Sequence, residues 1–196
     1  REDPQIDTNI VIVNIGNLNR AQIGKQIMNL SRCKPKVIGL DILFTCDWLK
    51  DTTLCPQIKD TVSNQIFANA VASTKNMVLG LKILQTDSLI EKMGDVAVYD
   101  SVLHTFDPLR RGAYEGFVNV ITIADHQEDL KACRSLNPRL KLVDGTEELA
   151  FSVRMAMLYD SIKTKKFLNR GNDEEIINYR GNIVDWHGAS TYPGRY

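Results

Sequence analysis

The chain has 196 residues, and its 43% hydrophobic and 24% charged content is that of one globular domain with a substantial core. Its 24 basic and 24 acidic side chains cancel, so the net charge gives no electrostatic argument for binding nucleic acid or an anionic membrane surface. No apolar run approaches the roughly 20 residues that a membrane helix needs.

The first half of the chain alternates apolar stretches with amphipathic helical patterns. Ile23, Ile27 and Leu30 repeat at helical spacing, after a cap provided by Asn17 or Asn19. In order, the sequence predicts a strand at 9–15, a helix to about 33, a strand at 36–44, a helix at 56–74 and a strand at 76–84. This β-α-β-α-β order predicts a mostly parallel sheet with right-handed crossovers.

The stretch Lys36–Phe44, KVIGLDILF, is the centre of the predicted fold. It is apolar almost throughout, which is typical of a strand buried on both faces of a parallel sheet. Asp41 is its one acidic residue, and a buried carboxylate needs hydrogen-bond partners. Two interpretations stay open. Either amides and hydroxyls of the loop 45–53 hold Asp41 in a structural role, or Asp41 contacts a ligand or ion at the carboxyl edge of the sheet.

The second half of the chain is less regular. Residues 85–115 contain glycine, proline and several aromatic residues without a clear period, and are interpreted as an excursion across the sheet. Asp144 begins the sequence DGTE, which is typical of a capping box and predicts one long helix from 147 to about 167. Further strands are expected at 116–123, 130–136 and 175–179.

The four cysteines and three histidines do not form a zinc motif. There is no C-x-x-C pair and the histidines are far apart in sequence, so no metal site is predicted. Cys46 and Cys55 flank the short polar segment CDWLKDTTLC. They are expected as free thiols in a cytosolic protein and as a disulfide in an exported one. No disulfide partner is assigned to Cys33 or Cys133. Cys33 is expected to be buried and to pack like a small apolar residue.

A search for catalytic and nucleotide-binding motifs finds none. The turn GNLNRAQIG after the first predicted strand contains neither G-x-G-x-x-G nor G-x-x-x-x-G-K-[ST], and the chain has no G-x-S-x-G or H-E-x-x-H. Carboxylates are plentiful, but their spacing pairs none of them for acid–base chemistry. The residues alone therefore indicate one α/β domain and give no argument for catalysis or for a cofactor.

Four stretches, taken in order, resemble a known family. IVIVNIGNLNRAQIGKQI, KPKVIGLDILF, GFVN and EIINYRGNI are similar in order and separation to the CHASE2 sensor domain, over residues 9–183. The resemblance implies the extracytoplasmic domain of a bacterial transmembrane receptor, with a membrane helix before Arg1 and further ones after Tyr196. It also implies a cytoplasmic output module such as a histidine kinase, an adenylate cyclase or a serine/threonine kinase. The domain itself is then not an enzyme.

The resemblance also names candidate site residues. The recurrent polar positions of the family match Asp41, Asn119, Asn178 and Tyr179, which are candidate ligand contacts on that basis. The alternative is structural, because Asn119 and Asn178 at strand ends can tie loops to backbone amides. The approach to the first helix is shorter than in many members and keeps only Arg20, so ligand contacts made by the missing segment do not transfer.

These observations predict one domain over residues 1–196, with its core at 9–183 and a tail at 184–196 leading toward a membrane segment. The expected fold is a mixed, mostly parallel sheet of five to seven strands with helices packed on it. The leading hypothesis is a periplasmic or cell-surface sensor of an inner-membrane protein that perceives a small-molecule or protein signal, with a homodimer as one option for its assembly. Two alternatives remain: an α/β enzyme with a nucleotide or sugar-phosphate site at the carboxyl edge of the sheet, and an extracytoplasmic protein-interaction module.

Overall fold

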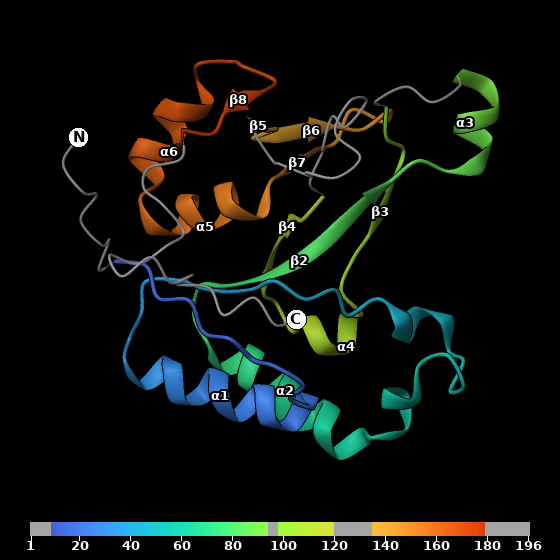
Figure 1. Ribbon diagram of the computed structural model, residues 1–196, viewed down its shortest axis with the longest axis vertical. Coiled ribbons are helices and arrows are strands. Elements are labelled where there is room, and N and C mark those ends of the chain that lie inside the picture. Colours follow the sequence, from blue (N-terminus) through green and yellow to red (C-terminus); the bar gives the residue numbers. More distant parts are fainter. Residues whose placement is uncertain (1–8, 94–97, 120–134, 179–196) are drawn as a thin grey trace, which may run out of the picture.

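The longest strand, β2, is the element around which the other strands are arranged (Figure 1). The computed structural model describes residues 9–93, 98–119 and 135–178. The helices are α1 (Arg20–Arg32), α2 (Thr61–Ser73), α3 (Asp87–Met93), α4 (Asp107–Arg110), α5 (Phe151–Tyr159) and α6 (Ser161–Leu168), with 3-10 turns η1 (Cys46–Leu49) and η2 (Pro56–Lys59). The strands are β1 (Ile38–Leu40), β2 (Met77–Leu84), β3 (Ser101–Leu103), β4 (Tyr114–Phe117), β5 (Ser135–Leu136), β6 (Arg139–Lys141), β7 (Glu147–Leu149) and β8 (Glu175–Ile176).

The main sheet is mixed and mostly parallel, as predicted. Strands β1 and β4 both run parallel to β2, with Ile38 opposite Met77 and Tyr114 opposite Val78. Strand β3 pairs antiparallel with the far end of β2. Two small antiparallel sheets, β5–β8 and β6–β7, complete the mixed α/β fold. The predicted count of five to seven strands was wrong, since the main sheet has four strands in the described part of the chain.

The predicted first strand, residues 9–15, was also wrong. This segment forms no strand, and Ile10, Val11 and Ile12 are 69%, 79% and 75% exposed. A β-branched run becomes a strand only when a neighbouring strand accepts its backbone hydrogen bonds, and β2 is already paired with β1 and β4 over its parallel half. The described residues therefore begin α1-β1-α2-β2 rather than with a strand.

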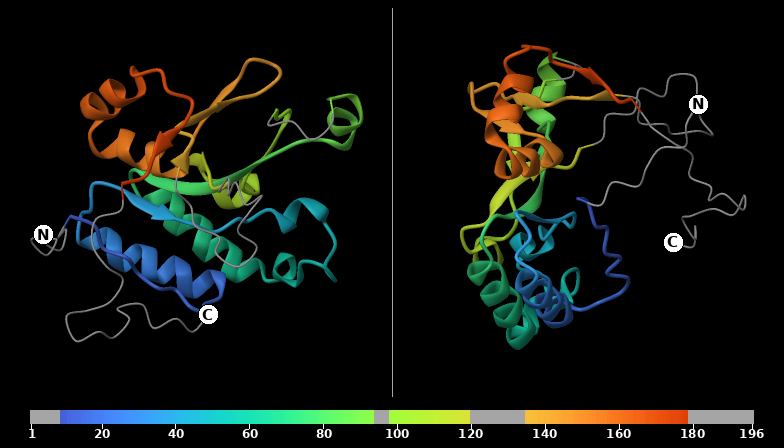
Figure 2. Two further views of the ribbon diagram at one scale, coloured as in Figure 1. Left: turned by 45° about the horizontal axis from the view of Figure 1, so that its top comes forward. Right: turned by 90° about the vertical axis from the view of Figure 1, so that its left-hand side faces the viewer.

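The hydrophobic core forms two clusters that share β2. Helices α1 and α2 lie on one side of β2, and α5 and α6 lie on the other, as two further views also show (Figures 1 and 2). The first cluster joins α1, α2 and α4 to the start of β2 and contains Ile23, Ile27, Leu40, Phe44, Phe67, Ala70, Val71, Met77, Leu79 and Leu109. The second joins α5 to the end of β2 and contains Leu81, Ile83, Phe117, Ala150 and Val153.

Two glycines allow helices to approach their neighbours closely. A Cβ at Gly24 of α1 would lie 3.1 Å from the Ile66 carbonyl oxygen and from the Phe67 Cα of α2. A Cβ at Gly116 of β4 would lie 2.6 Å from the Phe151 Cα at the start of α5. Both contacts involve backbone atoms that a side chain cannot push aside, so glycine is needed for close packing at these two positions.

The long helix predicted from 147 to 167 begins later than expected and is interrupted once. Residues Glu147–Leu149 form β7, and the following helix ends at Tyr159. Asp160 then adopts an extended conformation, and its side chain accepts a hydrogen bond from the Lys163 amide, so it caps the separate helix α6. Asp144 does not cap a helix, because its carboxylate instead bonds Thr146 within a tight turn.

Several other predicted boundaries shift. The excursion 85–115 contains α3, β3 and α4, so it holds more regular structure than expected. Strand β4 begins at Tyr114, and the predicted strands 116–123, 130–136 and 175–179 each extend into residues outside the described part. Cys33, expected to be buried, is an exposed free thiol just past the end of α1.

Candidate functional site

Asp41 directly follows β1 but is not buried. The prediction of a buried carboxylate in a central strand was wrong, because β1 lies at an edge of the described sheet, its pairing ends at Leu40, and Asp41 is exposed. Asp41 makes no hydrogen bond to any other described residue, so the 45–53 loop does not hold it as expected. It remains at the carboxyl edge of the sheet, where parallel folds place their ligand sites.

Asn119 has a structural contact. It follows β4, and its side-chain amide bonds both backbone groups of Ile83 on β2, with its Oδ1 2.8 Å from the Ile83 nitrogen and its Nδ2 2.8 Å from the Ile83 oxygen. The amide thus continues the β2–β4 ladder past the point where β4 ends. This arrangement is the structural alternative that the sequence left open.

The four candidate positions are not gathered into one site by the described structure. Since Val78 and Leu79 of β2 pair with both β1 and β4, these strands lie on opposite edges of β2, and Asp41 and Asn119 follow different edges. Asn178 follows β8 in a separate sheet and is exposed. Tyr179 lies outside the described residues.

A cavity of about 460 Å³ lies where the chain leaves the carboxyl end of β1, within the range of small-molecule sites. Its wall comes from the loop before α1, the start of α1, the segment after β1 and the start of α2. The lining residues are Ile15, Gly16, Asn17, Leu18, Asn19, Arg20, Ile23, Ile42, Leu43, Phe44, Cys46, Gln57, Asp60, Ser63 and Asn64. Asp41 is not among them, although its neighbour Ile42 is.

Arg20 is the central charged residue of this cavity. It is only 7% exposed, and its guanidinium lies 5.5 Å from the centre of the Phe44 ring. Its Nη1 and Nη2 atoms bond the two carboxylate oxygens of Asp47 at 2.8 and 2.5 Å, and Nη1 also bonds the Asn64 Oδ1 at 2.7 Å. Asp47 is 3% exposed, so the pair is a buried, two-pronged ion pair.

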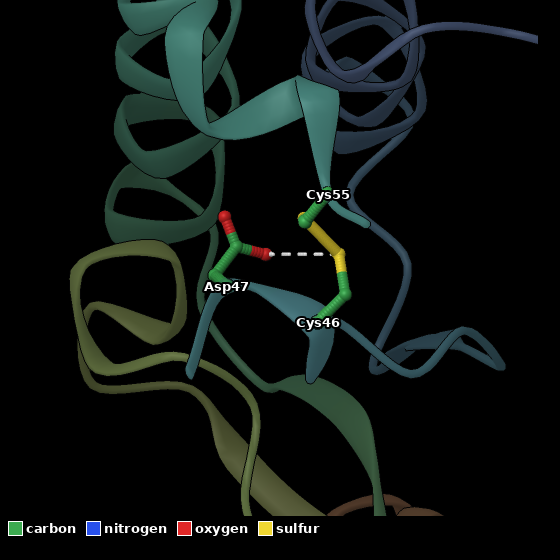
Figure 3. A group of neighbouring side chains, drawn as sticks. All are labelled: Cys46, Asp47 and Cys55. Atoms are coloured by element: carbon green, nitrogen blue, oxygen red, sulfur yellow. Dashed lines mark hydrogen bonds between the residues drawn. A yellow bond between two sulfur atoms is a disulfide. The ribbon is translucent and has the colours of Figure 1, made fainter. Parts of the chain in front are cut away.

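A disulfide fixes the loop that carries Asp47. The sulfur atoms of Cys46 and Cys55 are 2.11 Å apart, and Asp47 lies beside them, with its Oδ2 3.8 Å from the Cys46 sulfur (Figure 3). Cys46, Asp47 and Cys55 have potential metal-ligand atoms within 4.8 Å of one another. Because both sulfurs are joined and Asp47 is paired with Arg20, this group offers no free thiolate for a metal.

Asp60 supplies the other charge on the cavity wall. Its Oδ1 accepts a hydrogen bond from the Ser63 backbone amide at 3.0 Å and caps α2. Hydrogen bonds from the Ser63 hydroxyl and amide hold the pKa of the Asp60 carboxyl below its ordinary value, and the positive charge of Arg20 lowers the pKa further. Asp60 is therefore ionised at neutral pH.

From the sequence, neither Arg20 nor Asp47 was assigned a partner. Nothing in local sequence pairs two residues that are 27 positions apart. One observation pointed to Arg20, namely that it is the residue kept in the shortened approach to the first helix. The position of Asp47 next to Cys46 is the other available indication, since a disulfide immobilises its neighbours.

The mixed sheet, its helical layers and the disulfide-closed loop beside the cavity define a mixed α/β domain. A sequence model of the CHASE2 domain matches residues 5–193, so the chain belongs to the CHASE2 family. CHASE2 domains are extracytoplasmic, non-catalytic sensory modules, and membership implies signal sensing by a receptor.

No curated protein and no solved structure matches the chain. None of the described helices is both long and apolar enough to cross a membrane.

Proposed function

We propose that this domain is the extracytoplasmic sensor of a bacterial transmembrane receptor, carried by the inner membrane and facing the periplasm or cell surface. It perceives a small-molecule or envelope signal and passes the change to a cytoplasmic output module. Membrane helices outside the present chain link the two parts. The family match over residues 5–193 is the observation that carries this proposal.

The disulfide supports an extracytoplasmic location. Disulfides persist in oxidising compartments and are rare in the reducing cytosol, and here the pair Cys46–Cys55 closes a loop beside the buried ion pair of Arg20 and Asp47. A cytosolic domain would keep these two cysteines as thiols.

The complete reading frame tests the proposal directly. We expect an apolar segment of about 20 residues before Arg1 and more than one after Tyr196. A fusion of alkaline phosphatase after Asn178 in the full-length protein should be active, because that enzyme requires export. A frame without flanking membrane segments, or a fusion that is inactive although expressed, contradicts the receptor role.

A second candidate function is protein interaction, favoured by the exposed apolar residues Ile10, Val11 and Ile12. β-branched residues in an extended segment suit pairing with the same segment of a second copy, which would bury both. Sedimentation velocity is expected to show a dimer for the wild type and a monomer for Val11→Lys. Ile162→Lys serves as the matched control and should stay dimeric. Ile162 lies on α6, away from this segment in sequence, and its side chain is 81% exposed. A monomeric wild type excludes this candidate.

A further inference from the structure

We infer that the cavity beside Arg20 binds a small neutral sugar or polyol. The inference rests on the proposed sensory function and names the chemical class that the sensor recognises. Three features carry it: the N–H donors of Arg20 that make no bond to a described residue, the charge balance of the wall, and the presence of both amide and apolar side chains on the cavity.

Arg20 keeps hydrogen-bonding capacity for a ligand. A guanidinium has five N–H donors, and the bonds to Asp47 and Asn64 use three of them. The two remaining N–H groups make no hydrogen bond to a described residue, and Arg20 is among the residues that line the cavity.

The charge balance disfavours an ionic ligand. The positive charge of Arg20 is neutralised by the buried Asp47 at 2.5 Å. Asp60 is exposed, so water screens its carboxylate. Neither an anion nor a cation would therefore find an unpaired opposite charge inside the half-enclosed cavity. A neutral acceptor oxygen suits Arg20 without needing such a charge.

The remaining wall suits a ligand in which hydroxyls alternate with C–H groups. The side chains of Asn17 and Gln57 are exposed and carry both donors and acceptors, and a hydroxyl can use both. Leu18, Ile42 and Phe44 provide apolar surface on the same cavity. The volume of about 460 Å³ admits a monosaccharide with room for a substituent.

A series of sugars that share one ring and differ in charge tests the inference. Glucose and N-acetylglucosamine are the neutral probes, glucuronate and glucose 6-phosphate the anionic ones, and glucosamine the cationic one. Saturation-transfer NMR and calorimetry measure binding to the disulfide-bonded domain. We expect at least one neutral probe to bind, about tenfold or more tighter than each charged counterpart.

Two cavity-filling variants locate the binding. Asn17→Trp and Gln57→Trp each place an indole at the cavity from an exposed position, and each should weaken neutral-sugar binding about tenfold or more. Asn29→Trp is the matched control, because Asn29 is exposed on α1 and does not line the cavity. Thermal unfolding confirms that all three variants fold.

Three results overturn the inference: no neutral probe binds at millimolar concentration, a charged probe binds more tightly than every neutral one, or both filling variants bind as the wild type does. These results leave the receptor role intact, because that role is tested by the flanking membrane segments. Conversely, a reading frame without membrane segments removes the receptor role and leaves the measured sugar binding unaffected.

Discussion

Asn119 and Ile83 are joined by two hydrogen bonds of 2.8 Å that repeat the pattern of a strand ladder with a side chain in place of a strand. Strand β4 ends at Phe117, so without this amide the two backbone groups of Ile83 would lose their partner on that edge. Ile83 is 1% exposed and belongs to the second core cluster. The side-chain amide of Asn119 therefore satisfies the hydrogen-bonding groups of a buried stretch of backbone.

Replacing Asn119 with aspartate should destabilise the fold. Asn119→Asp removes the Nδ2 donor and sets an oxygen against the Ile83 carbonyl oxygen, which we expect to cost about 1–3 kcal/mol of unfolding free energy. Urea denaturation measures the loss. Asn178→Asp, at an exposed asparagine, is the control and should change stability by less than about 0.5 kcal/mol. Equal effects of both changes would contradict the role assigned to Asn119.

The buried ion pair predicts a large effect when one partner is removed. Asp47→Ala leaves the guanidinium of Arg20 buried with only Asn64 as a partner, and should cost about 3–5 kcal/mol. Asp107→Ala removes the 59% exposed partner of Arg110 and should cost less than about 1 kcal/mol. Chemical denaturation of both variants provides the comparison. A similar small loss for both would show that Arg20 and Asp47 are not paired in solution.

The disulfide is predicted to stabilise the fold by restricting the conformations available to the unfolded chain. Cys46 and Cys55 are nine positions apart, and the loop-entropy estimate for a loop of this size is about 2–3 kcal/mol. Reduction, or the double change of both residues to alanine, should lower the unfolding temperature. Cys33→Ala, at the exposed free cysteine, should not. Non-reducing peptide mapping of exported protein that finds Cys46 and Cys55 as free thiols would contradict the pairing.

Asp41 is expected to be dispensable for folding. Its side chain is exposed and has no hydrogen-bond partner among the described residues, so Asp41→Ala should change the unfolding free energy by less than about 0.5 kcal/mol. This expectation replaces the larger loss that a buried carboxylate would cause. A loss of more than about 1 kcal/mol in urea denaturation would show that Asp41 has a partner in solution.

The cap of α2 predicts a pH dependence. Hydrogen bonds from Ser63 lower the pKa of Asp60 in the folded chain below its ordinary value of 3.8. Because the folded pKa is depressed, the ionised cap contributes stability above the unfolded pKa, and that contribution is lost as pH falls through the folded pKa. Asp60→Asn keeps an acceptor oxygen but does not titrate, so its stability should fall less steeply below pH 3.8. Thermal unfolding of the wild type and of Asp60→Asn across this pH range provides the measurement. An equally steep loss of stability in both would contradict the prediction.

The sequence predicted those elements whose pattern is local. The helix of Ile23 and Ile27 and the strand Met77–Leu84 were predicted correctly, because each shows a regular apolar pattern bounded by a cap or a turn. The strand at 9–15 was predicted from β-propensity alone, and propensity does not specify whether a neighbouring strand is available. The interruption at Asp160 was missed because the apolar pattern continues across it, while a single extended residue ends the helix.

The candidate site was predictable only in its location. The carboxyl end of the strand predicted at 36–44 was the expected place, and the cavity adjoins Ile42 just after β1. Its principal residues, Arg20 and Asp47, come from segments that tertiary packing brings together, and neither belongs to a sequence motif. The candidates taken from family positions were strand-end residues, and Asn119 shows that such residues can serve the backbone instead.

The division of β2 between two clusters bears on how the domain unfolds. Met77 and Leu79 belong to one cluster and Leu81 and Ile83 to the other, so neither cluster can open without releasing part of the same strand. The two sides should therefore melt in a single cooperative transition, and the β2 amides should be among the slowest to exchange with deuterium. Strain introduced at the cavity by a bound molecule would then reach α5 through one continuous backbone.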